Sequence, residues 1–171
     1  GFGDREDLAV GAEPYGVLSG DFNGDGLLDL VVANRNDDNV SVLYGRLTGG
    51  FGLRQDLAVG QGPHRLATGD FDGDGLSDVV VTNTNDYAQE VTVLFGQGLG
   101  LGGQQEADVG SQPYGIVSGD FNNDGRTDLA VTNRGDDDVS LLYGKAGALF
   151  GNRQDVPVGD DPYGIASGDF N

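Results

Sequence analysis

Reactive side chains are scarce in this chain. Its 171 residues include no cysteine, one histidine (His64) and one lysine (Lys145). The absence of cysteine excludes disulfides, zinc–thiolate sites and cysteine nucleophiles. A single histidine, with serines at equivalent strand positions, leaves no nucleophile–base pair. We therefore expect no catalytic residues and no enzyme activity.

Basic residues are also few. Nine lysines and arginines face 28 acidic residues, so the formal net charge is −19. Nucleic acids and anionic membranes bind basic surfaces, so neither is an expected partner. No apolar run approaches the ~18 residues of a membrane span and no signal peptide is visible, so we expect no membrane insertion.

Glycine, by contrast, is abundant, with 32 residues, and apolar residues make up 37 % of the chain in short blocks. Short apolar blocks separated by turn residues are typical of many short strands and not of disorder. The composition therefore predicts an all-β fold.

Three copies of one nine-residue segment carry the clearest chemistry. They span residues 21–29, 70–78 and 120–128, and a fourth copy begins at Asp169. Each has Asp or Asn at positions 1, 3 and 5, glycine at position 6 and Asp at position 9. Short oxygen-bearing side chains at this spacing surround one centre, and calcium accepts six to eight oxygen ligands in flexible geometry. Glycine at position 6 permits a sharp bend.

We therefore expect about three calcium ions, one per complete loop. The expected side-chain ligands are Asp21, Asn23, Asp25 and Asp29 in the first loop, Asp70, Asp72, Asp74 and Asp78 in the second, and Asp120, Asn122, Asp124 and Asp128 in the third, with the carbonyl groups of Leu27, Leu76 and Arg126 as further ligands. The second loop has four carboxylates and the others three, so it is expected to bind calcium most tightly.

The loop admits two other interpretations. It is not an EF-hand, because its flanks are β-branched and its closing acid lies at position 9 instead of a glutamate at position 12. The second interpretation is a polar turn without metal, because Asn, Asp and Gly favour turns. The recurrence of Asp at position 9 favours calcium, and low-affinity calcium sites favour an extracellular location.

The whole chain is periodic. Aligned on Gly11, Gly60, Gly110 and Gly159, it repeats every 49, 50 and 49 residues. The apolar blocks predict strands at 15–20, 28–34, 40–45 and 54–59 in the first unit, 64–69, 78–83, 90–96 and 104–109 in the second, and 114–119, 128–133, 139–144 and 153–158 in the third. A period near 50 with four short strands is typical of β-propeller blades.

We accordingly predict a single β-propeller region over 1–171. Its three full blades of four antiparallel strands cover about 15–59, 64–109 and 114–158. An N-terminal outer strand at 5–10 and a C-terminal inner strand at 163–168 flank them.

The unit resembles the FG-GAP, or VCBS-type, repeat. The likeness lies in Phe-Gly at 51–52 and 150–151, in Val-Gly-x-x-Pro-Tyr-Gly, in the Gly-Asp-Phe-Asn-Gly-Asp-Gly loop and in the trailing Val-x-Val-Leu-Tyr-Gly. Such repeats occur in integrin α-subunit heads, fungal lectins and many bacterial secreted proteins. The resemblance implies a propeller of about seven blades with the calcium loop between the first and second strands.

Three blades do not close a ring of that size, and open ends would expose unpaired strand edges. The chain is thus expected to be either a segment of a longer propeller or a subunit completed by copies of itself. The fourth loop stops at Asn171, three residues after it starts, which favours a segment.

Residues outside the loops are candidates for function as well. Tyr15, Tyr114 and Tyr163 begin equivalent strands and are possible ligand-binding residues that stack on sugars, although filling the space between blades is the favoured interpretation. His64 holds the same place in the second unit and is expected to be a packing residue. The Arg-Gly-Asp at 134–136 lies in an ordinary turn, and Gly98-x-Gly100-x-x-Gly103 precedes a strand, so no phosphate cradle is expected.

The sequence thus predicts a non-catalytic, extracellular, calcium-binding module for adhesion or for recognition of a glycan or protein. Two alternatives stay open. One is a structural subunit that self-assembles into a surface layer or filament. The other is an accessory domain of a secreted polysaccharide-degrading enzyme.

Overall fold

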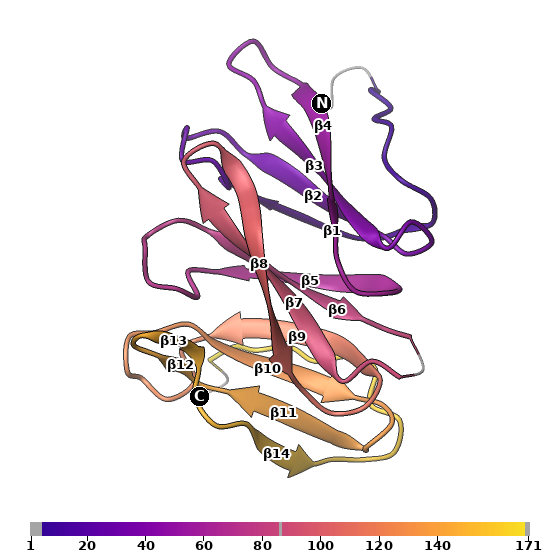
Figure 1. The fold of residues 1–171 in the computed structure, drawn as a ribbon, viewed down its shortest axis with the longest axis vertical. Coiled ribbons are helices and arrows are strands. Elements are labelled where there is room, and N and C mark those ends of the chain that lie inside the picture. Colours follow the sequence, from indigo (N-terminus) through magenta and orange to yellow (C-terminus); the bar gives the residue numbers. More distant parts are fainter. Residues whose placement is uncertain (1–4, 86, 170–171) are drawn as a thin grey trace.

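The computed structural model describes residues 5–85 and 87–169, apart from the side chains of Leu53 and Ala148. The described chain is all-β and forms three four-stranded antiparallel sheets stacked along its longest axis (Figure 1). The first sheet has the order β1 (Pro14–Gly20), β2 (Asp29–Asn34), β3 (Asn39–Gly45) and β4 (Phe51–Ala58). The second has the order β5 (Pro63–Gly69), β6 (Asp78–Asn83), β7 (Glu90–Gln97) and β8 (Gly100–Asp108).

The third sheet has the order β9 (Pro113–Gly119), β10 (Asp128–Asn133), β11 (Asp138–Leu142) and β14 (Gln154–Pro157). A small hairpin of β12 (Gly144–Lys145) and β13 (Ala148–Phe150) extends it. In the first two sheets the corresponding residues belong to the third and fourth strands, whose register shifts at this point. The prediction of four antiparallel strands per blade is therefore confirmed, and the extra hairpin is an irregularity that the sequence did not predict.

The middle blade is buried on both faces because its strand side chains alternate. Val79 and Val81 of β6 join the apolar cluster shared with the first blade. Val80, between them, joins the cluster shared with the third blade. All six residues of β6 are buried. A continuous apolar strand in this position is the pattern expected for a sheet covered on both sides.

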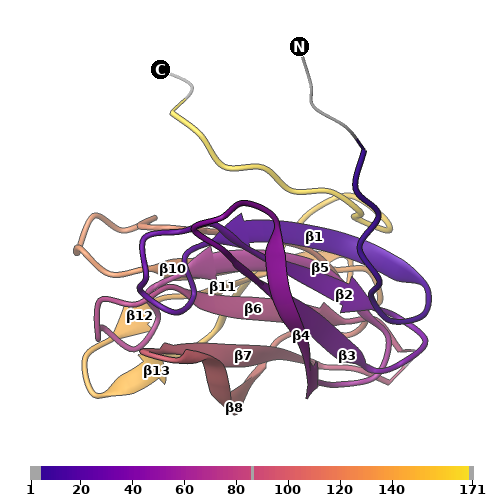
Figure 2. The ribbon, with the colours of Figure 1, turned by 90° about the horizontal axis from the view of Figure 1, so that it is seen from above.

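The first strands of the three blades lie side by side on one side of the stack, as β1 and β5 show in Figure 2. Their spacing is close. A Cβ on Gly16 of β1 would lie 2.5 Å from the carbonyl oxygen of His64 in β5. We call β1, β5 and β9 the inner strands.

The predicted strands at the two ends were wrong. Residues 5–10 and 163–168 form no strand. A strand needs a partner for its backbone hydrogen bonds, and no described strand pairs with either segment. Residues 165–168 nevertheless lie against the third blade and line a cavity with Val117 and Phe121. No helix in the described ranges is long and apolar enough to cross a bilayer.

Candidate metal centre

Each nine-residue loop joins the first and second strands of its blade and is closed by its first aspartate. In the first loop, Asp21 Oδ1 accepts a hydrogen bond from Gly24 N at 2.8 Å and Oδ2 accepts one from Gly26 N at 2.8 Å. Asp70 accepts the equivalent bonds from Gly73 at 2.7 Å and Gly75 at 2.9 Å. The carboxylate at position 1 is thus held inside the loop by backbone donors.

Glycine at position 6 is required by the backbone. Gly26, Gly75 and Gly125 have φ values of 81°, 89° and 83°, in the left-handed region that side chains disfavour. At position 4 the third loop has Asn123 at φ 59° where the other two have glycine. Asparagine is among the few residues that tolerate this conformation, so the three loops keep one shape.

The second loop brings three carboxylates together. Oxygen atoms of Asp70, Asp72 and Asp78 all lie within 4.8 Å of one another. Three hard oxygen donors converging on one point fit a calcium ion, which would neutralise their mutual repulsion. Burial raises the pKa of Asp78 to about 6, and the charges of Asp72 and Asp70 add to this shift against the backbone hydrogen bonds from Gly96 and Phe71.

The first and third loops carry asparagine at position 3. Asn23 and Asn122 each donate from the side-chain amide to the position-5 carboxylate at 3.1 Å. The amide oxygen accepts the backbone N–H of the same aspartate, at 3.0 Å in the first loop and 2.9 Å in the third. These loops therefore hold the predicted residues of positions 1, 3 and 5 in the same arrangement with one carboxylate fewer.

The aspartate at position 9 has a role that the sequence did not reveal. Asp29, Asp78 and Asp128 are fully buried. Asp78 Oδ2 accepts from Phe71 N at 2.7 Å, and Oδ1 accepts from Gly96 N at 2.8 Å, so one carboxylate ties the loop to the end of the third strand. The same pair of bonds recurs at Asp29 and Asp128. This residue supports the loop whether or not it also faces an ion.

The third loop differs at position 7. The guanidinium of Arg126 donates to Asp124 Oδ2 at 2.7 Å. Leucine holds this position in the other two loops. The third loop thus carries a positive charge beside one of its expected ligands, which lowers the negative potential available to a cation.

The aromatic residues singled out from the sequence do come together. Tyr15, His64, Tyr114 and Tyr163 form a row in which successive ring centroids are 4.3, 4.2 and 4.8 Å apart. We call this row the aromatic row. His64 is 2 % exposed between its two neighbours, so it is a packing residue as expected. Burial lowers the pKa of His64 to about 4, and the charges of Arg65 and Arg35 add to this effect.

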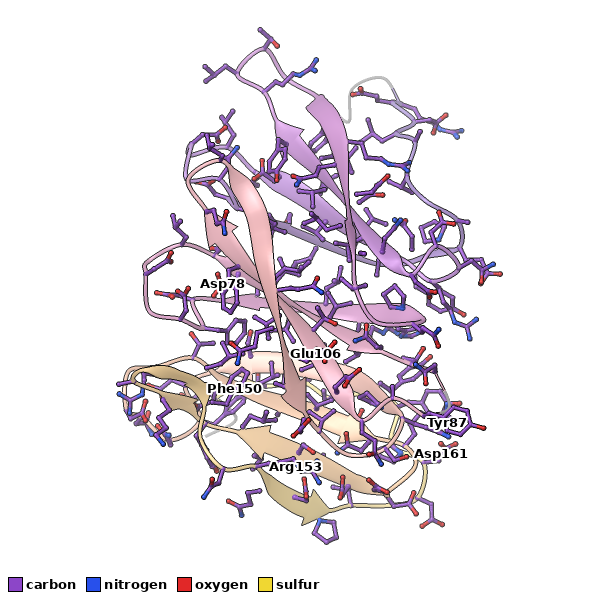
Figure 3. The ribbon with its side chains drawn as sticks, viewed as in Figure 1. Asp78, Tyr87, Glu106, Phe150, Arg153 and Asp161 are labelled. Atoms are coloured by element: carbon purple, nitrogen blue, oxygen red, sulfur yellow. The ribbon has the colours of Figure 1, made fainter. Side chains whose placement is uncertain are left out.

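The aromatic row and the loops lie at opposite ends of the inner strands. The rings lie where these strands begin, and the loops follow where they end. Figure 3 shows the same separation, with Asp78 on one side of the molecule and Asp161, next to the row, on the other. A calcium ion in a loop would therefore support the blade without touching the aromatic row.

Two arginines beside the aromatic row were missed from the sequence. The guanidinium carbon of Arg35 lies 5.7 Å from the Tyr15 ring centroid, and that of Arg134 lies 4.3 Å from the Tyr163 centroid. Both follow the second strand of a blade, at one position of the repeat where the middle blade has Thr84. This shared position in the repeat was the signal that the sequence offered for the two arginines. Their contacts with the aromatic row could not be predicted, because the rings belong to other segments of the chain.

Comparison with known families agrees with this architecture. A model of the FG-GAP-like repeat matches residues 21–81 and 70–131. A model of the FG-GAP repeat matches residues 113–150. No curated protein matches the chain. Together the repeat matches cover more than half of the chain, each including at least one nine-residue loop, and the chain belongs to the FG-GAP repeat family.

Proposed function

We propose that the chain is a non-catalytic, extracellular propeller module in which calcium stabilises the blades and the surface recognises a glycan or protein. The carboxylate cluster of Asp70, Asp72 and Asp78, with oxygens within 4.8 Å, carries the calcium part. Without a cation, carboxylates about 4 Å apart repel by about 4 kcal/mol per pair at an effective dielectric of ~20. A divalent ion removes this cost and joins the two strands of the hairpin.

The loops are expected to differ in affinity. The second has four carboxylates, the first has three, and the third has three with Arg126 paired to one of them. The affinity should therefore fall from the second loop to the first and then to the third. Three ions would change the formal charge from −19 to −13, because each adds two positive charges.

The extracellular location follows from the expected affinity. A calcium dissociation constant of ~0.1 mM is typical of extracellular modules, and the ion is present there at ~1 mM. At this ratio each site adds about 1.4 kcal/mol to the free energy of unfolding by mass action. Three sites would then supply a sizeable part of an ordinary domain's stability.

Thermal unfolding with and without chelator tests the calcium part. Excess chelator should lower the melting temperature by several degrees, about 2–4 °C per kcal/mol lost for a chain of this size, and added calcium should restore it. The double variant Asp70→Asn/Asp72→Asn should lose part of this shift. Glu106→Gln removes one exposed acid outside the loops and should keep all of it (Figure 3). A melting curve that excess chelator leaves unchanged would refute the calcium proposal.

A second candidate function is self-assembly into a larger structure. It is favoured by the open faces of the outer blades, where Val17 is 67 % and Phe121 is 37 % exposed. Sedimentation of the chain with and without calcium separates the two candidates, because large ordered particles support assembly and a particle of about 18 kDa supports the monomeric module.

A further inference from the structure

A cavity of about 240 Å³ opens beside the aromatic row. The four rings of the row line it, together with Arg35 and Arg134. It lies at the end of the inner strands opposite to the calcium loops. Its volume is below the usual range for drug-sized ligands, so it suits one small ring and its substituents.

The outer rings of the row keep surface for a ligand. His64 is covered by Tyr15 and Tyr114, but Tyr15 is 54 % exposed and Tyr163 is 52 % exposed. An exposed tyrosine ring at the edge of a cavity offers an apolar face and a polar hydroxyl, the combination that binds a ring bearing hydroxyl groups.

The charge at the cavity is unusual for this chain. Two of its nine basic residues line this cavity, although the formal net charge is −19. Arg134 Nε donates to Asp161 Oδ1 at 2.7 Å, and this bond leaves the terminal amino groups for another acceptor. Arg35 is paired more loosely with Glu13, at 3.6 Å. Two guanidinium groups disfavour a cationic ligand and favour a carboxylate, which arginine binds through two parallel hydrogen bonds.

The rim of the cavity is held in a fixed conformation. Gln112 and Asp161 have φ values of 55° and 53°, in the left-handed region that is uncommon for residues other than glycine. The Gln112 carbonyl accepts a hydrogen bond from Arg134 N at 3.1 Å. Glu13 and Gly62, which precede the prolines of the first two units, have φ values of 50° and 66°, so this turn recurs in every unit. The backbone of Arg134 is therefore held by this turn before any ligand arrives.

One buried polar atom at the cavity has no partner. His64 Nδ1 is buried and forms no hydrogen bond within the described part of the chain. An unpaired buried polar atom is costly, and native structures contain few of them. Gln112 and Thr84 line the same cavity and add polar groups to it.

We infer that this cavity binds an acidic saccharide, with uronate carboxylates bound by Arg35 and Arg134, which lie over different rings of the row, and a sugar ring resting on the exposed tyrosines. This inference rests on the proposed recognition function and names its ligand class. A nucleic acid does not fit, because it needs an extended basic surface, whereas the basic residues that line the cavity are Arg35 and Arg134.

Binding of a short uronate oligomer tests the inference. Trigalacturonic acid should bind the full chain in calcium-containing buffer, as measured by titration calorimetry. Its fully methyl-esterified form has the same rings without the charges and should bind at least tenfold more weakly, because a hydrogen bond to a charged group contributes about 1.5–3 kcal/mol. Acetate should bind far more weakly than the trisaccharide if the sugar ring contributes.

Substitutions locate the site. Arg134→Gln and Arg35→Gln should each weaken binding of trigalacturonic acid about tenfold or more. Arg54→Gln is the matched control, because Arg54 is an exposed arginine paired with Asp56 on the outer strand β4 and should bind as the unaltered chain does. Tyr15→Ala should weaken the binding of trigalacturonic acid and of its methyl ester to the same extent. Equal melting temperatures in calcium would establish that each variant is folded.

Several results would overturn the inference. They are equal binding of acid and ester, equal binding of acetate and trisaccharide, unchanged binding in both arginine variants, or no binding of the acid at millimolar concentration. Binding that survives in the arginine variants but is lost with chelator would place the sugar on the calcium loops and would also overturn it. If the melting shift with calcium persists in these cases, the calcium proposal stands while the ligand assignment fails.

Discussion

At the residue scale, the buried aspartate at position 9 of each loop differs from the exposed acids of the same loop in its backbone hydrogen bonds. Asp78 accepts two backbone hydrogen bonds, whereas Asp72 is exposed and its Oδ1 accepts only the N–H of Asp74, at 3.1 Å. In excess chelator at pH 7.5, Asp78→Asn should be less stable than Asp72→Asn by about 2–4 kcal/mol. Each variant removes one carboxylate from the cluster, but only the amide at position 78 has to replace an acceptor of two backbone hydrogen bonds.

Asp72→Asn is the control for this prediction. It creates the asparagine that the first and third loops already have and removes one repelling carboxylate, so in chelator its stability should equal or exceed that of the unaltered chain. In calcium it should lose part of the calcium-dependent stabilisation. Denaturant unfolding of the three proteins measures both effects. Equal stabilities of the two variants in chelator would show that the position-9 carboxylate has no separate structural role.

His64 makes a second prediction at this scale. Tyr15 and Tyr114 pack against the ring, and Arg65 and Arg35 contribute positive charge near it. The pKa in the folded chain is about 4, against 6.5 when unfolded. Between these values the unfolded chain binds a proton that the folded chain does not. Stability should therefore fall as the pH drops from about 6.5 to 4, by at most about 3 kcal/mol, and stay level below.

The comparison protein for the pH prediction is His64→Tyr, which places the residue of the other units in the row. Carboxylates titrate in both proteins, so the difference between their unfolding free energies isolates the histidine. This difference should widen by up to about 3 kcal/mol as the pH falls to 4. Parallel stability curves would mean that His64 gains a proton without cost and is not confined between the rings.

At the element scale, each blade depends on one glycine near the end of its third strand. Gly96 N donates to Asp78, and a Cβ on this residue would lie 2.5 Å from the carbonyl oxygen of Ser77. A Cβ on Gly45 would lie 2.5 Å from the carbonyl oxygen of Leu28, and a Cβ on Gly144 would lie 2.6 Å from that of Thr127. Because the obstacle is backbone, Gly96→Ala should lower the free energy of unfolding by about 2–3 kcal/mol.

Gly98, two residues further along, supplies the control for Gly96. No atom lies within 4 Å of the Cβ that it would gain. Gly98→Ala should therefore be neutral or slightly stabilising, by at most about 1 kcal/mol. Chemical denaturation of both variants in calcium is the measurement, and a neutral Gly96→Ala would contradict the close contact between strand and loop.

The elements also show what the sequence could and could not predict. Strands such as β6 and β10 were predictable at both ends, because their apolar blocks and the following Asn are local signals. The second role of Asp78 was not, because its partner Gly96 lies 18 residues away. The setting of Arg134 was hidden for the same reason, since it bonds Asp161 27 residues later. The predicted end strands failed because an apolar block supplies no partner for its backbone.

At the scale of the whole molecule, the three blades differ in how far their neighbours cover them. The phenylalanine at position 2 of each loop reports this difference. Phe22 is 0 % exposed under the second blade and Phe71 is 5 % exposed under the third. Phe121 is 37 % exposed and lines a cavity of about 460 Å³ with Ala130 and Ile165. The face that contains Phe121 is thus equivalent to faces that are buried elsewhere in the molecule.

This difference gives a prediction for the chain in solution. Phe71→Ala should lower the free energy of unfolding by about 3–5 kcal/mol, the usual cost of emptying a buried aromatic site. Phe121→Ala should cost less than about 2 kcal/mol at low protein concentration, because its side chain already contacts water.

If a second copy covers this face, the cost of Phe121→Ala should rise with protein concentration, since association stabilises the unaltered chain by mass action. Unfolding at two concentrations a hundredfold apart, with sedimentation at the same concentrations, measures this. A concentration-independent cost of about 3–5 kcal/mol would show that the third blade is already covered within one chain, and would remove the basis for self-assembly through this face.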